Sequence, residues 1–358
     1  MMVRERAAGI AEAASGFTEL LGEVRVQDLI ELLRLELGHE EALDEFAEYG
    51  SHRSRAIAPE NIVHVVSGNT PHGALQSLIR GLLVGSRNHV KLPTGGLAEV
   101  TAFVAALPEG LRELVELSET LPDAWIEGAE AVIVFGNDET VAALRKRVPA
   151  SIPFQAHGHR VSFGVVFGDH EAAARRAARD VSLFDQRGCL SPHDLYVAET
   201  GGLTARGFAG RLAEELAAFN ADSPRRKLSV GEAAEIVDLR TSYAFRSASD
   251  VRTQIWMSEG GTDWTVIYEE DSWFATSPGN RFVFVKPLPD DLTPALAPVR
   301  PWLASVGIWP ASMEAAERMG RLGVSRVCEL GEMQYPPLTW HAEGQANLGS
   351  LITWVDFG

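Results

Sequence analysis

The stretch that decides the fold is NIVHVVSGNTPHGALQSLIRGLLVGSRNHVKLP, residues 61–93. It opens with a short run of branched residues that predicts a buried strand, and a polar loop follows. Five apolar residues then recur at the spacing of one helix face: Leu75, Leu78, Ile79, Leu82 and Leu83. Gly85 is suited to end that helix, and NHVKLP predicts the next strand. A strand–helix–strand unit of this length predicts two parallel strands joined by a right-handed crossover.

The same alternation continues toward the C-terminus. The predicted elements are a helix at LAEVTAFVAALPEGLRELVEL (97–117), a strand at AVIVFG (131–136), a helix at DETVAALRKRV (138–148) and a strand at HRVSFGVVFG (159–168). Together they predict a doubly wound, Rossmann-like dinucleotide-binding domain over residues 61–165. Such domains bind nucleotides at the carboxyl ends of their strands.

Three further segments complete the predicted organisation. Residues 1–60 look helical and acidic, and we expect them to pack as an appendage rather than as a separate domain. Residues 166–330 mix helices and strands and predict an α/β catalytic domain. Residues 331–358 are rich in Pro, Trp and Gly, and we expect this segment to pack back across the domains.

Composition limits the function classes. Hydrophobic residues make up 46% and charged residues 23% of the 358 residues, which excludes a wholly disordered chain. The formal net charge of −17 repels phosphate groups, so neither nucleic acid nor an anionic membrane is expected as a main partner. The two cysteines, 139 residues apart, form no disulfide framework and no zinc-ligand spacing, so no metal is expected. No apolar run reaches the ~18 residues of a membrane span and no secretion signal is evident, so we expect a cytoplasmic protein.

The first candidate for chemistry is Cys189, in FDQRGCLSPHDLYV (184–197). This cysteine falls in a loop between a predicted helix and a predicted strand, where a thiol can meet a substrate. From the local pattern alone, a buried structural thiol is the alternative. Cys328 lies in the strand-like VSRVCEL and is expected to be structural.

Three weaker signals follow predicted strands. Asn69, in the loop SGNTPHG, is either an oxyanion donor or, with Thr70, a simple helix cap, and local grounds favour the cap. Lys91 ends a strand, where a cofactor ribose or phosphate would lie, although a surface lysine is the commoner case. Gly136 precedes a helix, and the chain contains neither a GxGxxG fingerprint nor a P-loop.

The order of these signals along the chain is more informative than any one of them. A strand with an Asn loop, a strand ending in Lys, a strand with a Gly loop and then Gln-Arg-Gly-Cys resembles the aldehyde dehydrogenase superfamily, and within it the LuxC-type acyl-CoA reductases. The resemblance covers roughly residues 60–358. It is carried by GNTPHGALQSLIRGLLVG, VKLP, AVIVFGND, VSLFDQRGCLSPHDLYV, SPGNRFVFVKPL and GEMQYPPLTWHAEG.

The resemblance implies an α/β, aldehyde-dehydrogenase-like fold and NADPH-dependent reduction of a fatty acyl thioester, acyl-CoA, to the aldehyde through a cysteine acyl-enzyme. Cys189 would match the nucleophile. Asn69 would match the side-chain half of the oxyanion hole, and the Cys189 N–H would be the other half. Gln186, three residues before the nucleophile, would order that loop.

The resemblance also implies cofactor contacts. Lys91 would hold the adenosine ribose and its 2′-phosphate, and Gly136 and Asn137 would lie close to the dinucleotide. Thr94 stands near the place where NAD-selective relatives tend to carry an acid. A neutral residue there, with Lys91 nearby, predicts a preference for NADPH.

One motif departs from the hydrolytic aldehyde dehydrogenases, whose Glu-Leu-Gly-Gly motif carries a Glu that activates water. The matching stretch here is AHGH, residues 156–159, which contains no carboxylate. A reductase must not hydrolyse its own acyl-enzyme, so the departure fits the expected chemistry. His157 is either a base or a structural histidine, and we expect it to be structural.

Three alternative functions remain open at this stage. They are an acyl-phosphate reductase of the glutamyl-phosphate type, a cofactor-free cysteine acyltransferase or thioesterase, and a non-enzymatic subunit that kept the fold. A buried or misplaced Cys189 would favour the last. The expected partners are an acyl-CoA or other acyl thioester, further copies of the chain in a homo-oligomer, and, as a candidate, an acyl-activating synthetase.

Overall fold

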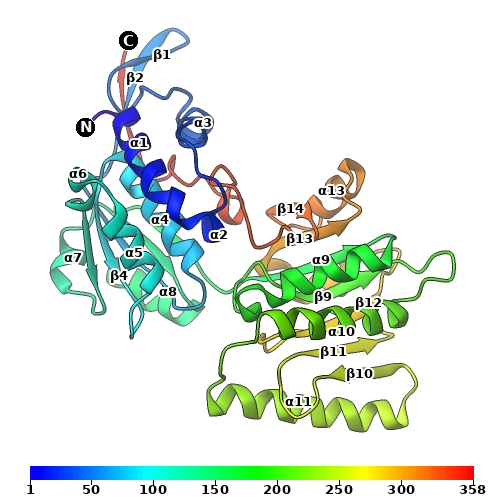
Figure 1. The fold of residues 1–358 in the computed structure, drawn as a ribbon. Coiled ribbons are helices and arrows are strands. Elements are labelled where there is room, and N and C mark those ends of the chain that lie inside the picture. The colour runs from blue at the N-terminus through cyan, green and yellow to red at the C-terminus, as the bar shows by residue number, and fades with distance from the viewer. The chain divides into compact units, whose positions relative to one another are not determined.

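The computed structural model describes residues 1–358, which form two compact units (Figure 1). Unit 1 comprises Met1–His159 and Pro337–Gly358, and unit 2 comprises Arg160–Pro336. The predicted boundaries after residues 165 and 330 both fall inside unit 2, six residues from its ends. Residues 1–60 belong to unit 1, and the segment 331–358 is divided between the two units.

Unit 1 is built on a five-stranded parallel sheet and a small three-stranded sheet. Its elements are α1 (Val3–Ala14), η1 (Ser15–Phe17), α2 (Thr18–Leu21), α3 (Val26–Leu37), β1 (Ala47–Tyr49), β2 (His52–Ile57), β3 (Asn61–Val65), α4 (Pro71–Val84), β4 (Arg87–Lys91), α5 (Ala98–Ala106), α6 (Glu109–Arg112), β5 (Val115–Ser118), α7 (Asp123–Glu127), β6 (Ala131–Phe135), α8 (Asp138–Arg145), β7 (Phe154–His157), η4 (Ala342–Gly344) and β15 (Thr353–Phe357).

The large sheet of unit 1 has the strand order β5-β4-β3-β6-β7. The chain winds outward from β3 through β4 to β5 and then returns to β6 on the other side, so the winding direction switches between β3 and β6. Apolar clusters cover both faces, one under α1, α3, α4 and α5 and one under α7 and α8. This is the predicted doubly wound arrangement.

Two strands of this sheet were not predicted. β5 (Val115–Ser118) occupies the end of the segment 97–117, where a helix was expected, and pairs in parallel with β4. The leucines that precede β5 have helical spacing, and the same spacing continues into the four residues of the strand. The prediction of a helix up to residue 117 was therefore wrong. β7 (Phe154–His157) closes the other edge of the sheet beside β6.

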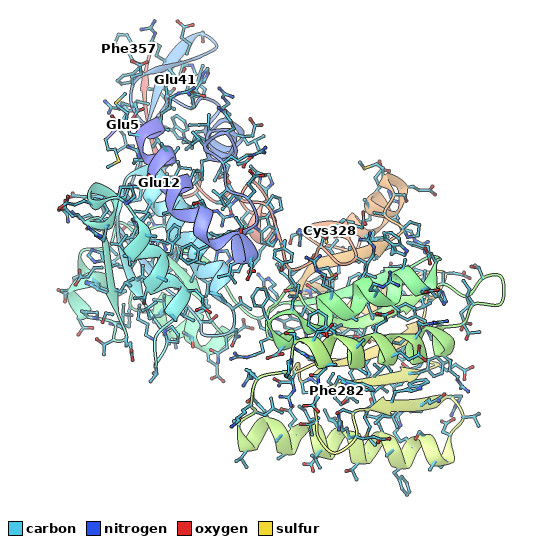
Figure 2. The ribbon with its side chains drawn as sticks, viewed as in Figure 1. Glu5, Glu12, Glu41, Phe282, Cys328 and Phe357 are labelled. Carbon is cyan, nitrogen blue, oxygen red and sulfur yellow. The ribbon has the colours of Figure 1, made fainter.

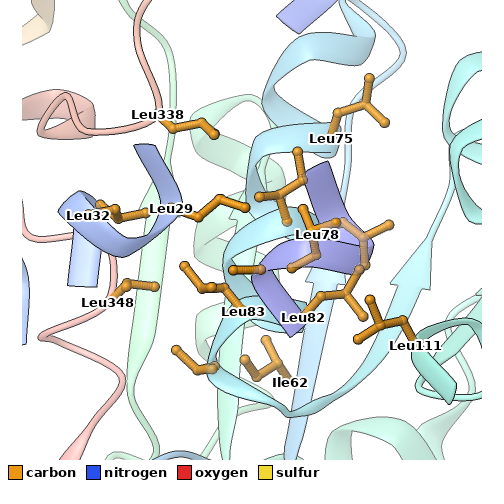
Figure 3. Packing of buried hydrophobic residues seen from close by; sticks show 14 of the residues in the cluster. Leu29, Leu32, Ile62, Leu75, Leu78, Leu82, Leu83, Leu111, Leu338 and Leu348 are labelled. Atoms are coloured by element: carbon orange, nitrogen blue, oxygen red, sulfur yellow. The ribbon is translucent and has the colours of Figure 1, made fainter. Parts of the chain in front are cut away.

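The helix α4 is the central packing element of unit 1. The five apolar residues of its predicted face are fully buried. Figure 3 shows the four leucines of this face among leucines from α3 and from the C-terminal segment, including Leu29, Leu338 and Leu348. Full burial of one such side chain contributes about 1.5–3 kcal/mol. The helix ends at Gly85, whose φ of 90° is left-handed.

A buried polar group joins α4 to the sheet below it. The His64 ring on β3 lies 2.8 Å from the Ser77 Oγ and 2.9 Å from the Asn88 Oδ1. Because the Asn88 amide nitrogen donates to the Ser86 carbonyl, its Oδ1 is an acceptor, so the His64 Nε2 carries the proton. Burial lowers the pKa of His64 to about 4, which keeps the ring neutral.

The end of the chain joins the β1–β2 hairpin in the three-stranded sheet, which has the order β1-β2-β15. β15 pairs antiparallel with β2, so Phe357 at the end of the chain lies opposite Arg53 (Figure 2). Residues 337–358 are therefore an integral part of unit 1. No helix of the structure has both the length and the apolar character needed to cross a bilayer.

Unit 2 contains a seven-stranded sheet of order β10-β11-β12-β9-β8-β13-β14, in which only β10 is antiparallel to its neighbour. Its elements are β8 (Val161–Val166), α9 (His170–Ser182), η2 (Leu183–Gln186), β9 (Pro192–Val197), α10 (Ala205–Asp222), α11 (Val230–Ser249), β10 (Thr253–Met257), β11 (Thr265–Glu269), β12 (Phe282–Pro287), α12 (Thr293–Leu296), η3 (Ala297–Trp302), β13 (Leu303–Trp309), α13 (Met313–Gly320) and β14 (Arg326–Glu329).

Helices cover both faces of this sheet. α9 and α10 pack on one face around Phe208 and Leu212, and α11, α12 and α13 cover the other (Figure 1). β8 lies between β9 and β13. Its assignment to the dinucleotide-binding domain was therefore wrong, because which sheet a strand joins depends on partners far away in the sequence.

We expect Gly81→Ala to destabilise unit 1. A Cβ at Gly81 would lie 1.9 Å from the Asn88 Oδ1 and 3.2 Å from the His64 Nε2, so the substitution overpacks the buried polar group. Overpacking of this kind costs about 1–3 kcal/mol. Gly231→Ala in α11 is the control, because nothing lies within 4 Å of its added Cβ, and there the better helix propensity stabilises by up to about 1 kcal/mol. Denaturant unfolding measures both, and equal effects of the two substitutions would contradict the expectation.

Candidate active site

Cys189 is exposed in the loop between η2 and β9, at the amino end of β9 in the middle of the unit 2 sheet. Cys328 differs in every respect. It lies within β14 (Figure 2), its thiol donates to the Val306 carbonyl at 3.8 Å, and burial raises the pKa of its thiol to about 11. The exposure of Cys189 counts against a non-catalytic subunit and against a buried structural thiol at this position.

The backbone before Cys189 is strained. Phe184, Asp185 and Gln186 have φ values of 53°, 53° and 58°, in the left-handed region that non-glycine residues rarely adopt. Each such residue costs about 1–3 kcal/mol and persists only where its surroundings hold it. The adjoining turn at Asn280 and Arg281 is also left-handed.

Gln186 is buried and bonds at both ends of its amide. Its Nε2 donates to the Pro192 carbonyl at 2.8 Å, and its Oε1 accepts the Phe282 N–H at 2.8 Å. The first bond closes the loop around Cys189, and the second ties that loop to β12. The side chain thus has the contacts expected of a residue that orders the cysteine loop.

Asp185 fastens the same segment to the linker between α10 and α11. Its carboxylate pairs with the buried Arg281 guanidinium at 2.8 Å and accepts the Arg226 N–H at 3.2 Å. Arg187 comes next, and burial together with the nearby Arg226 guanidinium lowers the pKa of Arg187.

The segment Gly331–Gln334 joins the cysteine loop from far away in the sequence. The Gln334 Nε2 donates to the Asp180 carbonyl and to the Ser191 Oγ, both at 3.2 Å. The Asp180 carboxylate accepts the Gly331 and Met333 N–H groups. Burial raises the pKa of Asp180 to about 7, and these two N–H donors oppose the rise. The sequence analysis identified the stretch around Cys189 and the stretch that begins at Gly331, but it did not predict the hydrogen bonds between them.

Asn69 does not cap α4. The N-cap residue is Thr70, with Pro71 in the first turn, and no side chain accepts a hydrogen bond from the helix amides. The prediction that Asn69 or Thr70 caps this helix with its side chain was therefore wrong. Asn69 is exposed in the loop after β3.

The candidate cofactor residues follow the carboxyl ends of adjacent strands. Lys91 is the last residue of β4, and Thr94 is exposed in the turn after it. Gly136 follows β6, where a Cβ would lie 3.2 Å from the Thr140 Cβ. The Asn137 side chain caps α8 and accepts the Thr140 N–H at 2.8 Å. Asn137 therefore has a structural role as the cap of α8, and its place beside a dinucleotide stays a prediction.

These residues fit a dinucleotide. β4, β3 and β6 are neighbours, so Lys91, the Asn69 loop and Gly136 lie along one edge of the unit 1 sheet, on strands ~4.8 Å apart. This edge includes the point where the winding direction switches, which is where doubly wound sheets bind nucleotides. The ammonium group of Lys91 suits the negative charge of a phosphate.

A carboxylate that sequence reasoning missed reaches the same edge. The Glu343 Oε1, from the C-terminal segment, lies 3.2 Å from the His157 Nδ1 at the end of β7. The His157 ring stacks on Phe135, with centroids 4.4 Å apart. The stretch 156–159 thus contains no carboxylate of its own, but Glu343 supplies one to His157 from the C-terminal segment.

Comparison with known proteins matches residues 8–354 to the family described as acyl-CoA reductase (LuxC). The chain is 24% identical to the long-chain acyl-protein thioester reductases of Aliivibrio fischeri and of Vibrio harveyi, over 85% of the chain and 65% of each relative. It therefore spans about two thirds of the length of these relatives.

Solved structures confirm the predicted fold. An NAD-dependent benzaldehyde dehydrogenase from Corynebacterium glutamicum has a TM-score of 0.66 and 14% identity, covering 100% of this chain and 86% of its own. An indole-3-acetaldehyde dehydrogenase from P. syringae, solved with NAD⁺, has the same TM-score and identity, covering 100% and 84%. The fold is aldehyde-dehydrogenase-like.

Proposed function

The chain belongs to the acyl-CoA reductase (LuxC) family, and from that premise we propose that it reduces a fatty acyl thioester to the aldehyde through an acyl-enzyme on Cys189. The observation that carries the proposal is the exposed Cys189 in a loop whose backbone is held by buried hydrogen bonds. A thiol with that access and that rigidity suits covalent catalysis, whereas Cys328, with its raised pKa, does not.

The first half of the proposed reaction is an exchange of thioesters. The Cys189 thiolate attacks the acyl carbonyl carbon, the carbonyl oxygen becomes an oxyanion, and the thiol of the donor leaves as its thiolate. The Cys189 N–H and the Asn69 amide donate to that oxyanion. Donors of this kind each contribute about 10²–10³ in rate. Exchange between two thioesters is close to thermoneutral, so the acyl-enzyme forms without a large energetic cost.

NADPH, when bound, supplies the hydride that reduces the thioester carbon. Lys91 binds its 2′-phosphate, the exposed Thr94 leaves room for that phosphate, and Gly136 lets the backbone approach the dinucleotide. Cys189 keeps the acyl group as a thioester until reduction and then leaves as a thiolate, which releases the aldehyde. No step of this proposed reaction uses water. This agrees with the stretch 156–159, which lacks the water-activating Glu.

The donor is proposed to be an acyl thioester whose thiol belongs either to CoA or to a protein. The family description names acyl-CoA, and the relatives from Aliivibrio fischeri and Vibrio harveyi are named for acyl-protein. A homo-oligomer and an acyl-activating synthetase that supplies the donor are part of the same proposal.

The decisive experiment is the intact mass of the protein after incubation with a long-chain acyl-CoA, or with an acyl-loaded carrier protein, in the absence of NADPH. We expect wild type and Cys328→Ala to gain the mass of one acyl group, because the reaction stops at the acyl-enzyme. Cys189→Ala should gain none. An unmodified wild type with both donors, or an equal adduct on Cys189→Ala, would exclude the proposal.

Asn69 is expected to act on the transition state. Because its side chain caps nothing, Asn69→Ala should leave the free energy of unfolding within about 0.5 kcal/mol of wild type. The acylation rate should fall by about 10²–10³. Asn69→Asp places a negative charge against the oxyanion and should lose at least as much rate while staying folded. Near-normal acylation in Asn69→Asp would mean that the oxyanion donor is another group.

Cofactor selectivity is expected to depend on Lys91. Fluorescence titration should give tighter binding of NADPH than of NADH, and Lys91→Ala should abolish that difference by removing the partner of the 2′-phosphate. Lys146→Ala is the matched control, because this exposed lysine of the same unit lies at the C-cap of α8. Tighter binding of NADH by wild type, or equal losses in the two variants, would contradict the assignment.

A further inference from the structure

The peptide group before Cys189 has a fixed direction. The Gly188 carbonyl accepts the Ser191 N–H at 3.0 Å, which closes a tight turn over residues 188–191. In a trans peptide the N–H points opposite to the C=O. The Cys189 N–H, which shares that peptide with the Gly188 carbonyl, is therefore directed out of the turn. This is the N–H that the proposed reaction uses as an oxyanion donor.

The peptide group after Cys189 is held by a different residue. The Ser162 Oγ donates to the Cys189 carbonyl at 2.7 Å. The same Oγ accepts the Ser305 N–H at 3.2 Å, so its proton is directed to the cysteine. Ser162 and Ser305 are both completely buried. A chain of two hydrogen bonds thus runs from β13 through β8 to the cysteine loop.

The sheet is irregular where this chain crosses it. The pairing of β8 with β9 shifts register between Ser162 and Phe163, and the pairing of β8 with β13 shifts between Leu303 and Val306. Irregularities of this kind re-aim side chains and are frequent beside active sites. Here the pairing of β8 is irregular next to Ser162 with both of its neighbouring strands, β9 and β13. The Ser162 hydroxyl bonds to the loop before β9 and to β13.

We propose that Ser162 is the positioning residue of the oxyanion site. Resting on the proposed acyl-enzyme at Cys189, this inference assigns to the Ser162 hydroxyl the task of fixing the backbone on the carboxyl side of the nucleophile. The Gly188–Ser191 bond fixes the amino side. With both flanking peptides held, the Cys189 N–H keeps its direction while the oxyanion forms. Without Ser162, a carbonyl loses its partner and the turn can rotate.

The test compares two reactions of the same thiol. Acylation by a long-chain acyl-CoA creates an oxyanion, whereas alkylation by iodoacetamide occurs at a saturated carbon and creates none. We expect Ser162→Ala to lower the acylation rate by about 10²-fold, the loss that a small misplacement of a catalytic group produces. Its alkylation rate should stay within about threefold of wild type. The acylation rate is measured by quenching the reaction at set times and recording the intact mass. The alkylation rate is measured in the same way with iodoacetamide.

Two variants serve as controls. Ser305→Ala removes an equally buried hydroxyl from the adjacent strand but keeps the main-chain N–H, so both rates should stay near those of wild type. Ser162→Thr keeps the hydroxyl and should recover most of the acylation rate, and this arm decides the question if Ser162→Ala does not fold.

Four results would overturn the inference: acylation within about threefold of wild type in Ser162→Ala, equal losses of acylation and alkylation, the same loss in Ser305→Ala, or no recovery in a folded Ser162→Thr. A wild type that does not acylate at all would instead refute the proposed function.

Discussion

The candidate active site depends on one buried amide, the side chain of Gln186. Three consecutive left-handed residues precede Cys189, and such a backbone unfolds to a relaxed loop unless its surroundings prevent it. Gln186 prevents this by bonding at once to the start of β9 and to the first residue of β12. Asp185 adds an ion pair with a buried arginine. The cysteine loop is therefore held against the sheet by these bonds, and the exposed Cys189 thiol lies on a rigid backbone.

Buried hydrogen bonds likewise join two of the sequence blocks that carry the family resemblance. The block around Cys189 and the block that begins at Gly331 are bonded through Gln334 and Asp180. A change in either block leaves a buried polar group of the other without its partner, which costs about 1–3 kcal/mol per group. Each block therefore depends on the other in the folded chain.

In unit 1 a single helix builds both the core and the edge where the cofactor is proposed to bind. The apolar face of α4 fills the space over the sheet, and the neutral His64 group ties that helix to β3 and β4. The amino end of α4 follows the Asn69 loop. Packing of the helix thus fixes the loop position without using the Asn69 side chain, whose role as an oxyanion donor is the one proposed above.

The sequence by itself determined the features that local spacing encodes. The apolar stripe of residues 75–83 predicted α4, and the order of strands and loops predicted the fold, whereas the loop position of Cys189 left both a catalytic thiol and a buried thiol open. It did not reveal β5, the sheet to which β8 belongs, the left-handed turn, or the partners Ser162, Gln334 and Glu343. Only the tertiary structure decided these, because the bonds involved join residues as far apart as His157 and Glu343, 186 positions along the chain. A hydrogen bond of that separation leaves no periodicity in the sequence around either partner, so it is defined only once the chain has folded.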